Sequence, residues 1–133
     1  MRDHRRYYFF LFLLVLAGVL AVLTVLRHQP FLRGSVGDIL VVPLMVFFML
    51  IFVRLRAAIA SGLGFAIAVL VECAQYIHLA DRLGLPRHGF LHQLLGNTFS
   101  FQDIAMYAIG AVFCCMVILF RERTSGKAAR LRA

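Results

Sequence analysis

Four long apolar runs, separated by short polar segments, dominate this chain. The first, from Tyr7 to Leu26, holds 20 residues without a charge, which is long enough to cross a hydrocarbon core of about 30 Å. The second, from Ile39 to Val53, is shorter and contains Pro43, which we place in its first turn, where a missing N–H costs least. The pattern predicts four membrane-spanning helices, at about residues 7–26, 38–53, 57–80 and 103–120.

The composition indicates a protein that is surrounded by lipid. Of the 133 residues, 62% are apolar, and the mean hydropathy is +0.89, whereas soluble domains are roughly 45–50% apolar. Too few polar side chains remain to cover a surface that faces water. We therefore predict an all-α integral membrane bundle of four transmembrane helices, with residues 1–120 as one transmembrane domain and residues 121–133 as a mobile, basic cytoplasmic tail.

A cleaved signal peptide is the alternative reading of the first run. Its apolar stretch is longer than the ~7–15 residues usual in such a segment, and no clear A-x-A cleavage site follows it. We therefore expect an uncleaved helix, which keeps the number of membrane spans at four.

The basic residues predict the orientation in the membrane. The net charge is +8, but lysine and arginine lie in the tails and connectors rather than on one aromatic-rich face, so no nucleic-acid partner is expected. Four spans place ten of them on one side: Arg2, Arg5, Arg6, Arg54, Arg56, Arg121, Arg123, Lys127, Arg130 and Arg132. The positive-inside rule then puts both termini in the cytoplasm, with the long connectors 27–37 and 81–102 outside.

Two polar side chains, Glu72 and Gln75, interrupt the third apolar run. If that helix leaves the core near Ala80, Glu72 lies about 12 Å below the outer surface, where an acid costs about 2.5–3.5 kcal/mol. Ser61 and Ala68 continue the same stripe with small side chains. Small side chains let helices approach closely, so we predict that this face is buried in the bundle.

Glu72 at this depth needs a partner or a proton. An arginine from the outer connectors could supply the partner, and the candidates are Arg33, Arg82 and Arg87. Without such a partner, we expect the carboxyl group to stay protonated.

The fourth run carries a second polar face at the same level. Asp103, Tyr107, Gly110 and Cys114 are spaced by four, three and four residues, which places them on one side of a helix. Tyr107 is expected about 6 Å inside the outer end. This is the level of Gln75, so we predict a hydrogen bond between these two side chains, direct or through water.

The second and fourth runs begin with similar sequences. Ser35 lies three residues before Asp38, and Ser100 lies three residues before Asp103. We expect each serine to cap a helix at its outer mouth, with the acid near the positive end of the helix dipole. An internal repeat is the alternative, but two short matches do not establish a duplication.

The last outer connector is predicted to form a short interfacial helix. Its apolar stripe consists of Phe90, Leu91, Leu94 and Leu95. His88 and His92 have the spacing of two metal ligands on a helix, but Pro86 and Gly89 weaken a helix there, so we expect interfacial histidines and no metal site. The sequence contains no phosphate-loop, dinucleotide-binding or nucleophile motif, and no cofactor is expected.

These motifs, taken in order, resemble a family of short four-helix bacterial membrane proteins that is a domain of unknown function. The resemblance covers about residues 5–120 and rests on Arg33-Gly34, Gly37-Asp38, Glu72-x-x-Gln75, Arg82, Arg87 and Asp103-x-x-x-Tyr107-x-x-Gly110. That family is in turn similar to the VanZ-like family, whose pattern is Glu-x-x-Gln, a loop Arg, and Asp-x-x-x-Asn-x-x-Gly. Tyr107 stands at the position of the Asn. The resemblance implies an envelope-facing protein of the bacterial inner membrane, since VanZ-like proteins are linked with glycopeptide resistance.

The leading hypothesis is an outward-facing polar pocket that binds a membrane lipid, either an anionic headgroup or a lipid-linked envelope precursor. Arginines above buried acids suit a phosphate group. The candidate ligand-binding residues are Arg33, Asp38, Glu72, Gln75, Arg87, Asp103 and Tyr107. The alternatives are an intramembrane acid/base enzyme acting on a lipid phosphate, a small ion or proton carrier, and a structural or assembly subunit without chemistry.

Overall fold

The structure is a computed structural model that describes residues 2–26, 28–84, 86, 89 and 99–130. In this part of the chain it contains helices and no strand: α1 (Arg2–Val25), α2 (Pro30–Phe52), α3 (Ala57–Tyr76), α4 (Leu79–Arg82) and α6 (Phe101–Arg130). Four of these helices are long and apolar enough to cross a membrane. The predicted all-α fold with four membrane-spanning helices is confirmed.

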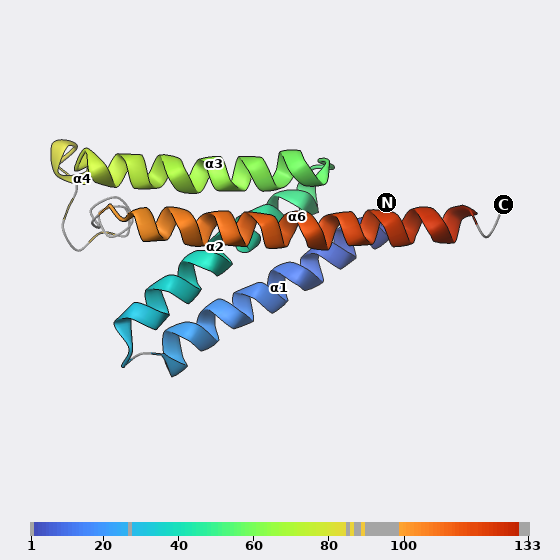
Figure 1. Ribbon diagram of the computed structural model, residues 1–133, viewed down its shortest axis with the longest axis horizontal. Helices are drawn as coiled ribbons and strands as arrows, with labels where there is room; N and C mark the ends of the chain where they lie inside the picture. The colour runs from blue at the N-terminus through green and yellow to red at the C-terminus, as the bar shows by residue number, and fades with distance from the viewer. Residues whose placement is uncertain (1, 27, 85, 87–88, 90–98, 131–133) are drawn as a thin grey trace.

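The four long helices are arranged as two pairs that cross each other (Figure 1). α3 and α6 run side by side along the long axis of the molecule, and α1 and α2 form a second pair that crosses them obliquely. α2 is the central helix, because it packs against α1, α3 and α6. Its side chains therefore supply much of the core.

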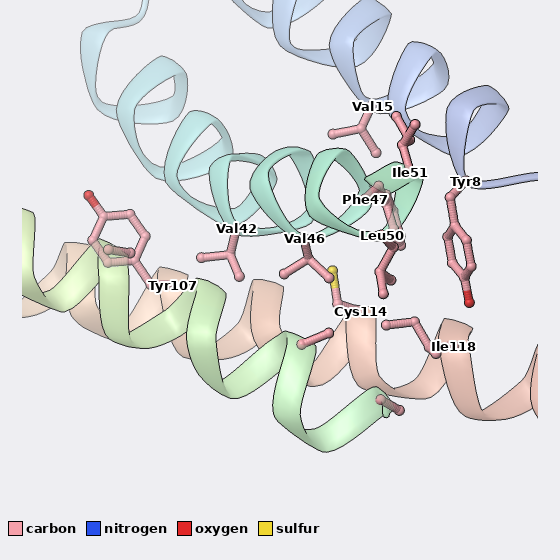
Figure 2. Close-up of a cluster of buried hydrophobic side chains, with 13 residues drawn as sticks. Tyr8, Val15, Val42, Val46, Phe47, Leu50, Ile51, Tyr107, Cys114 and Ile118 are labelled. Carbon is pink, nitrogen blue, oxygen red and sulfur yellow. The ribbon is translucent and has the colours of Figure 1, made fainter. Parts of the chain in front are cut away.

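The buried core follows the length of α2. Figure 2 shows Val46 and Leu50 of α2 pointing toward Cys114 and Ile118 of α6, while Tyr8 of α1 closes the far end of the cluster. On α6, Tyr107, Gly110, Cys114 and Ile118 are all buried, and on α3 the buried side chains are those of Ala57, Ala60, Ser61, Ala68, Glu72 and Gln75. The prediction that the face of α3 with Glu72 and Gln75 is buried in the bundle is confirmed.

The outside of the bundle is apolar. Phe10, Phe52, Leu70 and Phe120, one from each long helix, are largely exposed. A soluble protein rarely exposes such continuous apolar surface, whereas acyl chains suit it well. Burial and hydropathy therefore agree on a multi-pass membrane protein.

α2 and α6 approach most closely around Gly110. Pro43 has no N–H, so it leaves the carbonyl oxygen of Ile39, four residues earlier in α2, without the usual helical donor. A Cβ atom at Gly110 would collide with this oxygen and would also lie 3.2 Å from Cδ of Pro43. The glycine therefore fits because α2 presents a bare carbonyl and a flat proline ring at this position.

α2 begins earlier than the pattern of apolar residues indicated. It starts at Pro30 rather than near residue 38, with Gln29 as the N-cap and Pro30 in the first turn. Ser35 and Asp38 therefore lie inside the helix rather than at its mouth, and Pro43 lies in its interior. Backbone groups in a membrane must find partners within the chain, which favours a longer helix over a long connector.

The ends of α3 and α6 also differ from the expected bounds. α3 stops at Tyr76, because His78 takes a left-handed backbone conformation with φ of 51°, and the single-turn α4 follows. α6 continues to Arg130, so the predicted tail is helical as far as that residue. The apolar stripe expected to form the interfacial helix lies within residues 90–98, outside the described residues, as do His88 and His92.

Candidate functional site

Three acidic side chains from three helices meet toward one end of the bundle. Asp38 lies on α2, Glu72 on α3 and Asp103 on α6. Tyr107 lies one turn along α6 from Asp103 and contacts Glu72. We call these four residues the acidic cluster. The packing of α2, α3 and α6 thus brings together four of the residues that the sequence singled out.

Glu72 is the most buried member of the acidic cluster, with 1% of its surface exposed. The Tyr107 hydroxyl donates a hydrogen bond to Oε1 of Glu72 at 3.1 Å, and the backbone N–H of Ser100 donates to Oε2 at 3.2 Å. Each carboxyl oxygen therefore has a donor, and the side chain fastens α3 to the start of α6. Because α3 ends at Tyr76, Glu72 lies only about 6 Å from the helix end.

The partners of Glu72 differ from the predicted ones. Tyr107 bonds to Glu72 rather than to Gln75. Ser100, directly before the start of α6, donates its backbone N–H to Glu72. Among the described residues, the Tyr107 hydroxyl and the Ser100 N–H are the partners of Glu72, for which an arginine was expected. A backbone N–H has no signature in the sequence, so the contribution of Ser100 could not be recognised there.

Asp38 and Asp103 form the second contact within the acidic cluster. Their carboxyl groups lie close enough for a hydrogen bond between them. Such a bond needs one proton on one of the two groups, because two ionised carboxylates have only acceptor atoms. Asp103 is also near enough to Glu72 for their charges to interact. The three acids therefore lie near enough to one another for their charges to interact.

Further polar side chains pack around the acidic cluster. Nε2 of Gln102 donates a hydrogen bond to Oγ of Ser35 at 2.8 Å, which links α6 to α2. Ser35, predicted to be a helix cap, is therefore a bridge between two helices. Gln75 is buried on α3, close to one turn beyond Glu72. This end of the bundle thus holds a concentration of hydrogen-bonding groups inside an otherwise apolar protein.

Of the arginine candidates, the structure describes Arg33 and Arg82, and neither belongs to the acidic cluster. Arg33 is exposed near the start of α2, five residues before Asp38, which places it about 7.5 Å farther along the helix. Arg82 is exposed at the end of α4, and Arg87 lies outside the described residues. Arg33 could therefore meet a ligand that extends outward from Asp38.

An apolar groove lies next to the acidic cluster. It has a volume of about 490 Å³ and is lined by Cys73, Tyr76, Ile77, Phe99 and Phe101. Cys73 follows Glu72 directly in the chain, and Phe99 and Phe101 flank the residue whose N–H bonds to Glu72. The segment from Phe99 to Phe101 therefore contributes both to the acidic cluster, through the N–H of Ser100, and to the apolar groove, through its two phenylalanine rings.

A protein-family comparison assigns most of this region to one family. The family model described as "Protein of unknown function (DUF2809)" matches residues 27–111, which is more than half of the chain. The chain belongs to the DUF2809 family. Membership of a family of unknown function, as the sequence motifs indicated, is thereby confirmed. No curated protein and no solved structure matches the chain.

The matched region of this DUF2809 protein contains the whole acidic cluster. Carboxyl oxygens accept hydrogen bonds and attract cations, so the cluster suits hydroxyl or ammonium groups. Among the described residues, His, Cys, Asp and Glu side chains do not form a group of three or more that could hold a metal ion.

Proposed function

We propose that this DUF2809 protein binds the headgroup of an envelope lipid at the acidic cluster. The observation that carries the proposal is the convergence of Asp38, Glu72 and Asp103 from three different helices. Ionisable groups within a membrane are costly and usually serve a function. Three acids near enough for their charges to interact are difficult to explain by helix packing alone, since Tyr107 and Ser100 already satisfy Glu72.

The location of the site favours a lipid over a ligand from solution. Glu72 lies about four residues from the end of a membrane-spanning helix, close to the depth of lipid headgroups. The groove formed with Phe99 and Phe101 is apolar and opens beside the acidic cluster. A lipid whose headgroup donates hydrogen bonds to the carboxyl groups could lay a hydrocarbon chain in this groove.

Arg33 supports a lipid that also carries a phosphate. A guanidinium group about one and a half turns outward from Asp38 would meet a phosphate while hydroxyl or ammonium groups reach Asp38. A lipid-linked envelope precursor with a sugar headgroup has this combination of groups. The orientation that we propose, with both termini in the cytoplasm, places the acidic cluster in the outer leaflet, and the similarity to the VanZ-like family supports a role in the envelope.

The amount of lipid retained by an Asp38→Asn variant tests this proposal. Asparagine keeps the size of the side chain and can donate the hydrogen bond to Asp103, so the packing of α2 on α6 is preserved. We expect the variant, purified in a mild detergent, to retain roughly tenfold less of the bound lipid, as for the loss of one charge-assisted hydrogen bond. Native mass spectrometry measures the bound lipid, and extraction identifies it.

Asp81→Asn is the matched control for this experiment. Asp81 is an exposed acid on α4, so its replacement removes the same charge without changing the acidic cluster. We expect this variant to retain the lipid of the wild type. Equal lipid content in wild type and Asp38→Asn would contradict lipid binding at the acidic cluster.

A further inference from the structure

A groove lies between α3 and α6, toward the end of α3 that is remote from Glu72. It has a volume of about 360 Å³, and the described residues that line it all come from these two helices, which run side by side (Figure 1). Its lining includes the small residues Ala58 and Gly62 of α3 and Ala108 and Ala111 of α6. Small side chains leave space between the helices. We call this space the α3–α6 groove.

Ser61 adds a hydroxyl group to the lining of the α3–α6 groove. Only 4% of the residue is exposed, and its Oγ has no hydrogen-bond partner among the residues that the structure describes. A hydroxyl within a helix commonly bonds to the carbonyl oxygen three or four residues earlier, as those of Thr24 and Thr124 do in this chain. A buried hydroxyl without such a bond is costly, and an acceptor in the groove would satisfy it.

The depth of Ser61 indicates which acceptor can reach it. The membrane-spanning part of α3 begins at Ala57, four residues before Ser61, so the hydroxyl lies about 6 Å inside this boundary. In a glycerophospholipid, the ester carbonyl oxygens are the acceptors closest to the hydrocarbon core, whereas the phosphate lies farther out, in the headgroup region. An ester carbonyl is therefore the lipid acceptor that matches the depth of Ser61.

Arg56 lies where the phosphate of the same lipid would be. It is exposed and directly precedes the first residue of α3, so it is farther from the membrane centre than Ser61. A guanidinium group binds phosphate oxygens well. The cation, the hydroxyl and the apolar groove thus follow one another along α3 in the order of the phosphate, the ester and the acyl chain of a phospholipid.

The size of the α3–α6 groove favours an acyl chain over a helix of a second copy. One turn of an α-helix, with a diameter of about 10–12 Å, takes up roughly 400–600 Å³, which is more than the groove holds. A hydrocarbon chain is much narrower. Apart from the hydroxyl of Ser61, the described side chains that line the groove are apolar, so they suit such a chain.

We propose that the α3–α6 groove holds one acyl chain of a glycerophospholipid and recognises its ester group. The Ser61 hydroxyl donates a hydrogen bond to the ester carbonyl oxygen, Arg56 contacts the phosphate, and the chain lies against Gly62 and Ala108. The site shares no residue with the acidic cluster. In the orientation that we propose, it lies in the cytoplasmic leaflet, and the bound chain fills the space between α3 and α6.

Two lipids that differ only in their linkage test the ester contact. Phosphatidylglycerol with ester-linked chains is compared with its ether-linked analogue, which has no carbonyl oxygen, by native mass spectrometry of the full chain in detergent. We expect the wild type to bind the ester lipid roughly fivefold more tightly, as for one hydrogen bond, and Ser61→Ala to bind both lipids equally. Equal binding by the wild type, or an unchanged preference in Ser61→Ala, would overturn the proposal.

Gly62→Leu tests whether the chain occupies the groove. No atom lies within 4 Å of the position of its Cβ, so leucine enters open space and the fold should be preserved. We expect this variant to lose the ester preference. Ala66→Leu is the control, because Ala66 is exposed one turn farther along α3 and is not among the residues that line the groove. Equal effects of both variants, or a wild-type dimer that Gly62→Leu dissociates, would overturn the proposal.

Arg56→Gln tests the phosphate contact separately. Both lipids carry a phosphate, so we expect this variant to bind each of them roughly fivefold more weakly and to keep the ester preference. Arg54→Gln is the control, because Arg54 is exposed in the same turn but lines a cavity with His4 of α1. Equal weakening by both variants would overturn the phosphate contact in favour of a diffuse basic surface. None of these outcomes affects the function proposed for the acidic cluster.

Discussion

Replacing Glu72 with glutamine is expected to destabilise the protein by about 1–3 kcal/mol. The carboxyl group accepts two hydrogen bonds, one on each oxygen. Glutamine has one acceptor oxygen. If this oxygen takes the N–H of Ser100, the NH₂ group can only donate to the Tyr107 oxygen, so that hydrogen bond reverses and the Tyr107 hydroxyl proton loses its acceptor. Unfolding in mixed micelles by titration with a denaturing detergent measures the change in the free energy of unfolding.

Tyr107→Phe separates the two hydrogen bonds of Glu72. It removes the hydroxyl donor and leaves the bond from Ser100 in place. A cycle of Glu72→Gln, Tyr107→Phe and the double variant should show a coupling energy of about 0.5–3 kcal/mol, as found for residues in direct contact. Additive effects of the two substitutions, or a Glu72→Gln variant as stable as the wild type, would contradict the geometry of the acidic cluster.

Replacing Gly110 with alanine is expected to cost about 1–3 kcal/mol, the usual range for overpacking of a tight contact. The new Cβ atom would meet the carbonyl oxygen of Ile39 and the ring of Pro43. Since a backbone oxygen cannot rotate away, α2 and α6 must separate. The same unfolding titration measures the loss, and weaker packing of α2 on α6 should also loosen the contact between Asp38 and Asp103.

Gly62→Ala is the matched control for this substitution. Gly62 is also within a membrane-spanning helix, and no atom lies within 4 Å of the position that its Cβ would occupy. We expect its stability to be unchanged or slightly raised, because alanine favours a helix over glycine by up to about 1 kcal/mol. If Gly62→Ala and Gly110→Ala lowered the free energy of unfolding by similar amounts, the space around each glycine would not explain the effect of the substitution.

The number of spans could be predicted because it depends on local properties of the chain. A run such as residues 7–26 has the length and hydropathy of a membrane-crossing helix, whatever packs against it. The buried faces of α3 and α6 follow from helical spacing in the same way, since Glu72 and Gln75, or Tyr107 and Gly110, lie on one side of their helices by geometry alone.

The helix ends were harder to predict because they depend on competing signals. Gly34, Ser35 and Gly37 read as a polar connector, but Pro30 in the first turn and the need for backbone hydrogen bonds extend α2 over them. The end of α3 depends on one backbone conformation, at His78, that many sequences can adopt. Neither the start of α2 nor the end of α3 therefore has an unambiguous pattern in the sequence.

The identity of the polar partners could not be read from the sequence because it depends on the crossing of the helices. The level of Tyr107 along α6 suggested Gln75, whereas the side-by-side packing of α3 and α6 puts the hydroxyl beside Glu72. Asp38 was predicted at the mouth of its helix, and it reaches Asp103 only because α2 approaches α6 closely at Gly110. Such contacts require the relative placement of whole helices.

The convergence of the acids from α2 and α6 can be tested by cysteine crosslinking in membranes. In a chain whose three native cysteines are replaced by alanine, Asp38→Cys is combined with Asp103→Cys or with Ala105→Cys. Ala105 lies at nearly the same depth on α6 but is exposed to lipid. With a short reagent that joins two thiols, and peptide mapping of the monomer, we predict an intramolecular crosslink between positions 38 and 103 and little between 38 and 105. Equal crosslinking of both pairs, or a crosslink to position 105 alone, would contradict the account.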